Sequence, residues 1–292
     1  MSISTAAGSV KIRRAHPEDA DACGRICFDA FAAINNQHNF PPDLPSTEFG
    51  IGLMRSVFSH PHFYTVVAES DGQIVGSNCL DERSVIAGVG PITVAPSAQN
   101  RSIGRMLMQA VMDRARERGF AGIRLLQAAF HNRSLSLYTK LGFDAREPVS
   151  VMQGQPIKRA FEGWTVRPAV MDDLEAAARV CETVHGHNRT GELRDAILQN
   201  TASVVERRGQ LTGYSSALAF FGHTVGLTNL DVQALIASAE TFGGPGILVP
   251  TRNSELFRWC LENSLRVLYP MTLMTVGLYN EPNGGYLPSI LY

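Results

Sequence analysis

The chain has 292 residues, which is long for one compact domain and sufficient for two domains that each bury a core. Hydrophobic residues make up 45% and charged residues 18%, a balance that excludes an intrinsically disordered chain. The 26 Lys and Arg residues almost match the 27 Asp and Glu residues, so we expect no nucleic-acid partner.

Cysteine usage and hydropathy indicate the compartment. The five cysteines are scattered and form no C-x-x-C pair, which argues against a disulfide framework and against a structural zinc ion. No run approaches the roughly 18 apolar residues of a membrane helix, and the N-terminus has no basic region followed by an apolar stretch. We therefore expect a cytoplasmic protein with no metal and no membrane partner.

Strands and helices are predicted in a definite order along the first half. A strand at 10–14 leads into a helix opened by Pro17, and a second helix follows at 46–60. Three β-rich runs come next, at 62–70, 73–82 and 85–96, with the hairpin signal Asp71-Gly72 between the first two. The remaining elements are a helix at 102–119, a strand at 122–130, a helix at 133–142 and a strand at 143–152.

The second half repeats this order. KIRRAHPEDADA at 11 is echoed by TVRPAVMDDLEA at 165, GQIVG at 72 by GQLTG at 209, and NRSLSLYTKLG at 132 by NSELFRWCLEN at 253. The separation of matched segments shrinks along the chain, so the second copy is expected to lack one segment early and another before its last helix. We predict an α/β (α+β) chain with domains at 8–153 and 164–292 and a linker at 154–163.

The segment from Ile92 to Arg105 carries the candidate phosphate chemistry. A strand ends near Pro96 and a short loop opens a helix, so several backbone N–H groups can point at one anion. Gly104 would allow close backbone approach to a ligand, and Arg101 and Arg105 can add charge-assisted contacts. A plain surface turn before an amphipathic helix is the alternative.

Two motifs resemble those of the GNAT superfamily of acyl-CoA-dependent N-acyltransferases. Its acyl-CoA loop, V-x-P followed by Q-x-x-G-x-G/A, is matched by Val94, Pro96, Gln99 and Gly104, with Ser102 in place of the first glycine. Its second motif, N-x-x-(A/S)-x-x-L-Y-x-x-x-G-F, is matched in HNRSLSLYTKLGF by Ser134, Leu137, Tyr138, Gly142 and Phe143. His131 occupies the leading Asn position and Asn132 follows one place later, so either side chain could serve the cofactor.

The resemblance implies two GNAT-like domains, each a mixed, mostly antiparallel sheet flanked by helices. In the first, the sheet would splay between strands near 86–95 and 122–129, and pantetheine would lie in the splay. Acetyl-CoA would be the cosubstrate, and an amine would attack the thioester directly. The implied cofactor-binding residues are Ile92, Thr93, Val94, Gln99, Asn100, Arg101, Ser102, Ile103, Gly104, Arg105, His131, Asn132, Ser134 and Tyr138.

The resemblance also suggests catalytic roles. Tyr138 would act as general acid toward the departing thiolate, although a tyrosine held only by ring packing is the alternative. Asp81 and Glu82 are the nearest acids to the fourth strand and are candidates for accepting the ammonium proton, against the alternative of an ordinary solvated turn. In the second copy Trp259 replaces Tyr138 and no phosphate loop is present, so that copy should not catalyse the reaction.

The expected function is N-acetyl transfer to a primary amine, with a small molecule favoured because the sequence shows no long charged docking surface. A protein N-acetyltransferase and a non-catalytic acyl-CoA sensor are the alternatives, and the retained Tyr138 favours an enzyme. The second copy is expected to stabilise the first domain, to build a wall of the acceptor pocket, or to form the interface of a homodimer.

Overall fold

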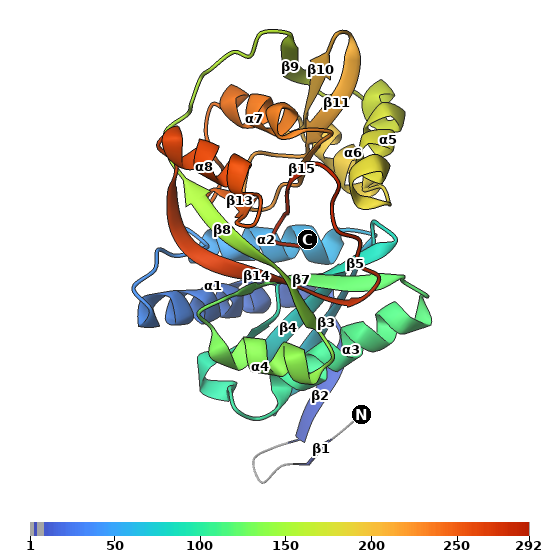
Figure 1. The fold of residues 1–292 in the computed structure, drawn as a ribbon. Coiled ribbons are helices and arrows are strands. Elements are labelled where there is room, and N and C mark those ends of the chain that lie inside the picture. The colour runs from blue at the N-terminus through green and yellow to red at the C-terminus, as the bar shows by residue number, and fades with distance from the viewer. Residues whose placement is uncertain (1–2, 5–8, 292) are drawn as a thin grey trace. The chain divides into compact units, whose positions relative to one another are not determined.

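The computed structural model describes residues 3–4 and 9–291. The chain divides into two compact units (Figure 1). One contains the described residues up to Glu82 together with Ile86–Leu125, and the other contains Arg83–Val85 together with the described residues from Leu126 onward. The predicted division at 154–163 follows the repeat of elements, whereas these units follow compactness, so the domain boundaries stay a prediction.

The first unit is a sheet with helices on both faces. Its strands are β1 (Ile3–Ser4), β2 (Ser9–Arg14), β3 (Phe63–Ser70), β4 (Gln73–Asp81), β5 (Ile86–Val89), β6 (Thr93–Val94) and the first part of β7 (Gly122–Ala128). Its helices are η1 (Pro17–Asp19), α1 (Ala20–Gln37), α2 (Thr47–Ser59), η2 (Pro96–Ala98) and α3 (Ile103–Glu117).

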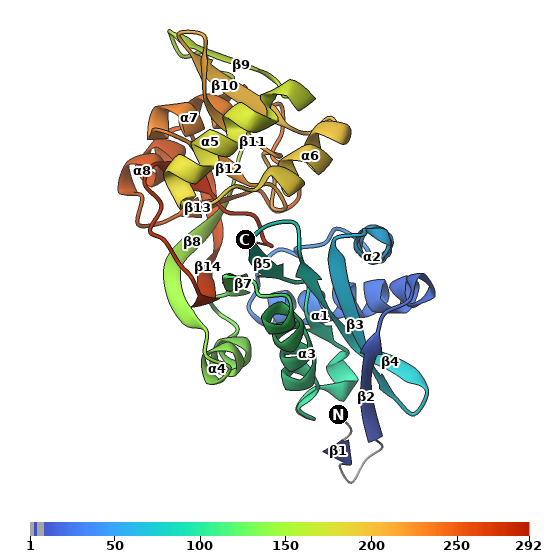
Figure 2. The same ribbon diagram turned by 90° about the vertical axis from the view of Figure 1, so that its right-hand side faces the viewer.

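Pairing in this sheet is antiparallel from β1 through β5, and parallel between β5 and β7. Side chains along β4 alternate between the two faces, as a strand requires. Asn78 donates to the carbonyl oxygen of Leu107 in α3, whereas Cys79 lies near Cys23 and Cys27 of α1. The sheet is therefore packed between α3 and α1, as Figure 2 shows.

The second unit begins with α4 (Asn132–Lys140) and holds two groups of strands. A five-stranded antiparallel sheet has the order β15-β12-β11-β10-β9, from Gly285–Leu287, Thr224–Gly226, Gln210–Ser215, Ser203–Arg207 and Trp164–Pro168. Separately, β8 (Asp144–Gln153) pairs antiparallel with β13 (Ile247–Pro250) and β14 (Arg266–Gly277). The other helices are η3 (Met171–Asp173), α5 (Leu174–His185), α6 (Thr190–Leu198), α7 (Asn229–Ser238) and α8 (Ser254–Glu262).

The same pattern of ion pairs occurs at the first strand-to-helix corner of each half. Arg13 contacts Asp19 at 2.7 Å and Glu69 at 3.0 Å, and Asp19 also accepts the backbone N–H of His16. The counterparts in the second half are Arg167, Asp173 and Glu206, with ion-pair distances of 2.8 Å and 2.6 Å. The hydrogen bonds from these arginines are the main reason that the pKa of each aspartate lies below its usual range.

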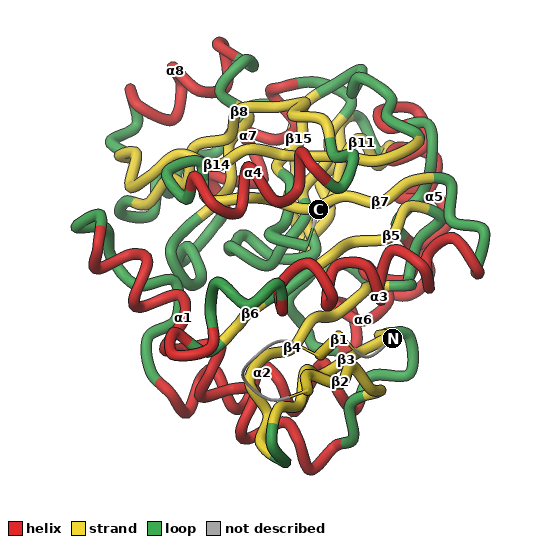
Figure 3. Tube along the Cα trace, turned by 90° about the horizontal axis from the view of Figure 1, so that it is seen from below, coloured by secondary structure: helices red, strands yellow, loops and turns green. Residues whose placement is uncertain are grey.

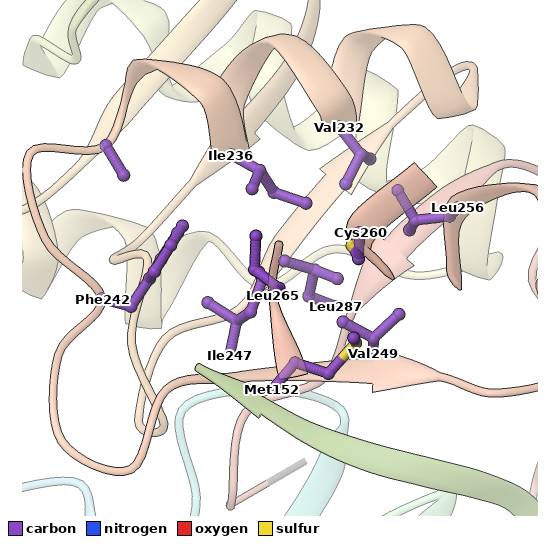
Figure 4. Close-up of a cluster of buried hydrophobic side chains, with 11 residues drawn as sticks. Met152, Val232, Ile236, Phe242, Ile247, Val249, Leu256, Cys260, Leu265 and Leu287 are labelled. Carbon is purple, nitrogen blue, oxygen red and sulfur yellow. The ribbon is translucent and has the colours of Figure 1, made fainter. Parts of the chain in front are cut away.

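One hydrophobic core cluster of the second unit lies between α7, α8 and the ends of β8 and β13 (Figure 4). Its members are Met152, Val232, Ile236, Ala239, Phe242, Ile247, Val249, Leu256, Cys260, Leu265 and Leu287. Met152 comes from the first sequence repeat and the others come from the second. Because β8 has both of its strand partners beyond residue 153, the two repeats share this core.

The segments missing from the second copy are loops and helix turns. Its α7 has 10 residues where α3 has 15, and only Leu227 and Thr228 separate β12 from α7. Between β6 and α3, by contrast, the first copy has the whole segment from Ala95 to Ser102. Within the described residues, no helix is long and apolar enough to cross a membrane.

Candidate active site

The fourth strand of the first copy is interrupted by a β-bulge. Leu80 of β4 faces Val89 of β5, and Ser77 faces Thr93 of β6, so two residues of β4 face the three residues Gly90 to Ile92. The N–H of Gly90 donates to the carbonyl oxygen of Cys79 at 2.9 Å, and its φ of 146° is open only to glycine. A bulge turns the backbone groups of a strand away from the regular ladder.

Asn78 supports this bulge from the opposite strand. Its Oδ1 accepts the N–H of Cys79 at 2.9 Å, and its Nδ2 donates to the carbonyl oxygen of Leu107 at 3.3 Å. The fully buried amide therefore satisfies a backbone group at the bulge and ties β4 to α3. Asn78 was not among the predicted site residues, because an isolated Asn in a strand acquires this role only through the packed helix.

The sheet opens beside the bulge. β5 pairs with β7 over three residues, from Ile86 opposite Gly122 to Gly88 opposite Arg124. Beyond this point the strand is displaced by the bulge, and its continuation β6 pairs with β4 (Figure 3). The predicted separation of these two strands thus begins after Gly88, and Ile92, Thr93 and Val94 follow it directly.

The loop before α3 has the conformation of an anion cradle. Asn100 and Ser102 both have left-handed backbone angles, with φ of 66° and 60°, and such alternation turns successive N–H groups to one side. Ser102 is the N-cap of α3 but makes no side-chain cap hydrogen bond, and the first turn has no acidic residue. Gln99 connects the loop to the end of β6, because its Nε2 donates to the carbonyl oxygen of Val94 at 3.3 Å.

The corresponding helix of the second copy is capped by the protein itself. At the start of α7, the carboxylate of Asp231 accepts the N–H of Thr228 at 2.9 Å and its hydroxyl at 2.7 Å. The same fully buried carboxylate accepts Trp164 Nε1 at 2.8 Å and Thr212 Oγ1 at 2.7 Å. The Asp231 carboxylate therefore lies at the N-terminus of α7, whereas the equivalent helix α3 of the first copy has no side-chain cap.

The residues of the second predicted motif lie on and beside α4, in the second unit. Gln127, at the end of β7, donates from Nε2 to Ser134 Oγ at 3.0 Å and to the carbonyl oxygen of His131 at 3.1 Å. Ser134 also donates to that carbonyl at 2.9 Å. Ser134 of the motif therefore fixes the first turn of α4, which starts at Asn132. The buried Gln127 lies beside these motif residues, although the motif itself did not indicate it.

Tyr138 lies in the last turn of α4 and is 7% exposed. Its ring packs on Phe143 at a centroid distance of 6.0 Å, while its hydroxyl makes no hydrogen bond to any residue in the described part of the chain. Burial raises the pKa of the Tyr138 hydroxyl above its ordinary value, so the group holds its proton through mildly alkaline pH. Trp259, its counterpart on α8, instead packs on Phe161.

The two candidate carboxylates differ in their surroundings. Both oxygens of Glu82 accept hydrogen bonds from Arg114 of α3, at 2.7 Å and 3.0 Å, so this side chain forms a bidentate ion pair. Asp81 is the last residue of β4, is buried, and lies opposite Gly88. The structure thus gives Glu82 a structural partner that the sequence did not indicate.

The structure brings the predicted residues together in two groups. Asp81, Glu82 and the stretch from Ile92 to Arg105 belong to the first unit, and His131, Asn132, Ser134 and Tyr138 belong to the second. Among residues 3–4 and 9–291, no cluster of three or more His, Cys, Asp or Glu side chains suits a metal ion.

Comparison with known proteins finds similarity to one family of acetyltransferases. The sequence profile of the acetyltransferase (GNAT) family matches residues 31–143. A mycothiol acetyltransferase of Nocardia farcinica is 38% identical over 63 residues, which are 22% of this chain and 21% of that protein. An IAA acetyltransferase of Azospirillum brasilense is 27% identical over 122 residues, which are 41% of this chain and 80% of that protein. The chain therefore matches only about a fifth of the length of the first of these relatives.

Solved structures extend the likeness to the whole chain at the level of fold. A protein of Pyrococcus horikoshii provisionally named an acetyltransferase has a TM-score of 0.72 and 18% identity, covering 99% of this chain and 94% of that one. A tandem GNAT protein from the clavulanic acid biosynthesis pathway has a TM-score of 0.56 and 13% identity, covering 92% and 98%. Residues 31–143 therefore match the GNAT family, and the whole chain shares the fold of these two solved structures, one of which is a tandem GNAT protein.

Proposed function

We propose that the protein is an N-acetyltransferase that moves an acetyl group from acetyl-CoA to a primary amine of a small molecule. The observation that carries the proposal is the start of α3, where a loop with two left-handed residues leads into a helix without a side-chain cap. Such a terminus favours a bound anion, and the pyrophosphate of coenzyme A is the anion that members of this family bind there.

The residues present fit this cosubstrate. The loop from Gln99 to Arg105 contains two arginines and no acid, so its charge agrees with a pyrophosphate. The second copy provides an internal comparison, because there Asp231 already supplies a negative charge to the equivalent helix. We infer that acetyl-CoA binds through the first copy, and that Ile92, Thr93 and Val94 present backbone groups to its pantetheine arm.

Acetyl-CoA, when bound, supplies a thioester whose carbonyl carbon accepts the amine nitrogen. We assign the polarisation of the carbonyl oxygen to backbone N–H groups beside the bulge at Gly90 to Ile92. Asp81 and Glu82 are the two carboxylates considered for the ammonium proton, and both oxygens of Glu82 accept hydrogen bonds from Arg114. His131 and Asn132 remain alternative contacts for the cofactor.

Tyr138 is assigned to the sulfur leaving group. Because burial raises the pKa of its hydroxyl, complete proton transfer to a thiolate is less favourable than for an ordinary tyrosine. A hydrogen bond donated to the sulfur as its negative charge develops needs no such transfer, and it stabilises the departing group equally directly. We therefore describe Tyr138 as a hydrogen-bond donor to the sulfur, which leaves as a thiolate and takes its proton from solvent.

A small-molecule acceptor is favoured by two observations. The relatives from Nocardia farcinica and Azospirillum brasilense are named for mycothiol and for IAA. The sequence also contains no long run of acidic or basic residues for docking a protein substrate.

A panel of amines tests the proposal. The release of coenzyme A thiol from acetyl-CoA is followed with tyramine, spermidine, glucosamine and a peptide with a free N-terminus, and the acetylated product is identified by mass. Transfer to a small amine above the rate with water supports the proposal. Transfer to the peptide alone would make the protein a peptide or protein acetyltransferase, and acetyl-CoA binding without transfer to any amine would favour a sensor.

A further inference from the structure

The turn between β4 and β5 belongs to a different compact unit from the strands that it joins. Arg83–Val85 group with the second unit, while Glu82 and Ile86 on either side group with the first. This turn leads directly into β5, and β5 leads within four residues to the bulge at Gly90. The position of the turn is therefore tied to the strand that we assign to catalysis.

The turn is held by three residues of the α6 region. Arg83 Nη1 contacts Asp195 Oδ2 at 2.9 Å, and these side chains are 14% and 24% exposed. Ser84 Oγ donates to the carbonyl oxygen of Asn188 at 3.1 Å. A Cβ atom on Gly191 would lie 2.6 Å from the carbonyl oxygen of Arg83, so this glycine permits backbone contact.

Two of these contacts come from one face of α6. Gly191 and Asp195 are four residues apart in this helix, the spacing that places residues on the same side, and Asn188 lies just before the helix begins at Thr190. The opposite side of α6 is anchored in its own core by the buried Leu193 and Ala196.

A buried polar network keeps the start of α6 in place. Arg189 Nε donates to Glu192 Oε2 at 2.9 Å, and Ser216 Oγ donates to Glu192 Oε1 at 2.9 Å. Asn188 Oδ1 accepts the hydroxyl of Thr190 at 3.0 Å. The surface that receives the turn is therefore rigidly supported.

The other side of the turn is equally constrained. Glu82, directly before it, is bound by Arg114 of α3, and Ile86, directly after it, pairs with Gly122 of β7. A three-residue connection between such fixed ends has little freedom to absorb a displacement. A shift at Arg83 must therefore pass into β5.

We propose that the degenerate second copy positions the catalytic strand of the first through this turn, with Arg83, Ser84, Gly191 and Asp195 as positioning residues. The inference rests on the proposed acetyl transfer and gives the second copy a role in it. Acetyl-CoA binding, which we assign to the loop before α3, should depend little on the turn. Alignment of the backbone at the bulge should depend on it strongly, because displacement of reacting groups by about 1 Å can slow an enzyme by about 100-fold.

Two kinds of variant test the proposal. Gly191→Ala places a methyl group against the backbone of the turn, and Gly52→Ala is its control, because a Cβ on Gly52 of α2 meets nothing within 4 Å. Arg83→Ala removes the ion pair, and the double variant Arg83→Asp with Asp195→Arg re-forms it with the charges exchanged. Each variant is measured by hydrogen exchange of the amides at 81–89, by acetyl-CoA affinity, and by thiol release with the amine that the panel identifies.

We expect Gly191→Ala and Arg83→Ala to accelerate exchange at 81–89 and to lower kcat about tenfold, with acetyl-CoA affinity within about twofold of the wild type. The charge-exchanged variant should recover most of the lost rate, and Gly52→Ala should match the wild type. Unchanged exchange in both variants would overturn the docking of the turn. Faster exchange with unchanged kcat would overturn its positioning role.

Failure of the proposed function would look different. A wild-type protein that transfers acetyl groups to no amine overturns the function and, with it, the catalytic part of this inference. The exchange measurement in that protein still decides whether α6 holds the turn, since it requires no substrate.

Discussion

Tyr138 shows how burial changes the task that one side chain can perform. An ordinary tyrosine has a pKa of about 10, close enough to that of a thiol for proton transfer as the thiolate forms. Burial on α4 raises the pKa of this hydroxyl, so its proton is held more tightly. The same burial removes competing water, which strengthens any hydrogen bond that the hydroxyl donates.

We expect Tyr138→Phe to lower kcat by about 100-fold while acetyl-CoA affinity stays within a few-fold of the wild type. The ring and its contact with Phe143 are retained, so stability should change little. Steady-state kinetics near pH 8 with an accepted amine provide the measurement. If kcat stays within about threefold when chemistry limits the rate, the hydroxyl has no catalytic role.

Asp231 illustrates a buried charge that the protein satisfies internally. Its carboxylate accepts hydrogen bonds from Trp164, Thr212 and Thr228, so Asp231→Ala would leave several buried donors without an acceptor. We expect a loss of about 2–4 kcal/mol in the free energy of unfolding, measured with urea. The exposed Asp172→Ala serves as control and should change stability by less than about 0.5 kcal/mol.

At the scale of single elements, α3 and α7 are equivalent helices of the two copies whose N-termini differ, because that of α7 has a side-chain cap and that of α3 has none. Both follow the strand after a hairpin, and both begin with backbone N–H groups directed along the helix axis. The loop from Ala95 to Ser102 keeps the terminus of α3 available, whereas the two-residue connection before α7 places Asp231 there. Loop length therefore separates the proposed ligand site at α3 from the capped helix α7.

We expect Gly104→Glu to abolish acetyl-CoA binding in calorimetry, because the added carboxylate lies in the first turn of α3, where the pyrophosphate is proposed to bind. Gly52→Glu on α2 introduces the same charge at an exposed helix position and should bind normally. Undiminished binding by the Gly104 variant would remove the loop from the cofactor site.

At the scale of the whole molecule, the two repeats depend on each other through β8. This strand ends the first repeat, yet its partners β13 and β14 come from the second. Val149, Val151 and Met152 of β8 are buried, so their apolar surface has no cover in the first repeat alone.

We therefore expect residues 1–153 expressed alone to lose cooperative thermal unfolding, as followed by circular dichroism. The full chain cleaved at a protease site introduced between 154 and 163 is the control, and it should stay associated and folded. A stable fragment that binds acetyl-CoA would show that the first repeat does not need β13 and β14 as partners of β8.

Binding stoichiometry is the second property of the whole molecule. We expect one acetyl-CoA site per chain by calorimetry, because only the first copy has the extended loop before its third helix. In the second copy β15 pairs with β12, over Thr224 opposite Leu287 to Gly226 opposite Gly285. In the second copy, β15 therefore occupies the free edge of β12, which is the fourth strand of that copy. Two equivalent sites would contradict this interpretation.

Much of the element order was predictable from local patterns. Asp71-Gly72 predicted a hairpin, and both residues have positive φ between β3 and β4, as Arg208 and Gly209 do between β10 and β11. Apolar spacing predicted α3, and the echo of KIRR by TVRP predicted the matching corners around Arg13 and Arg167. These features depend on neighbours within a few residues or on direct repetition, so the sequence by itself determined them.

Other properties required residues far apart in the chain to meet. The partners of β8, the insertion of β15 beside β12, and the ion pair between Glu82 and Arg114 each join distant segments. The support that Asn78 gives the bulge and the contact of Arg83 with Asp195 arise in the same way. Local periodicity carries no information about such pairs, because their energy comes from burial and hydrogen bonds that exist only once the chain has folded.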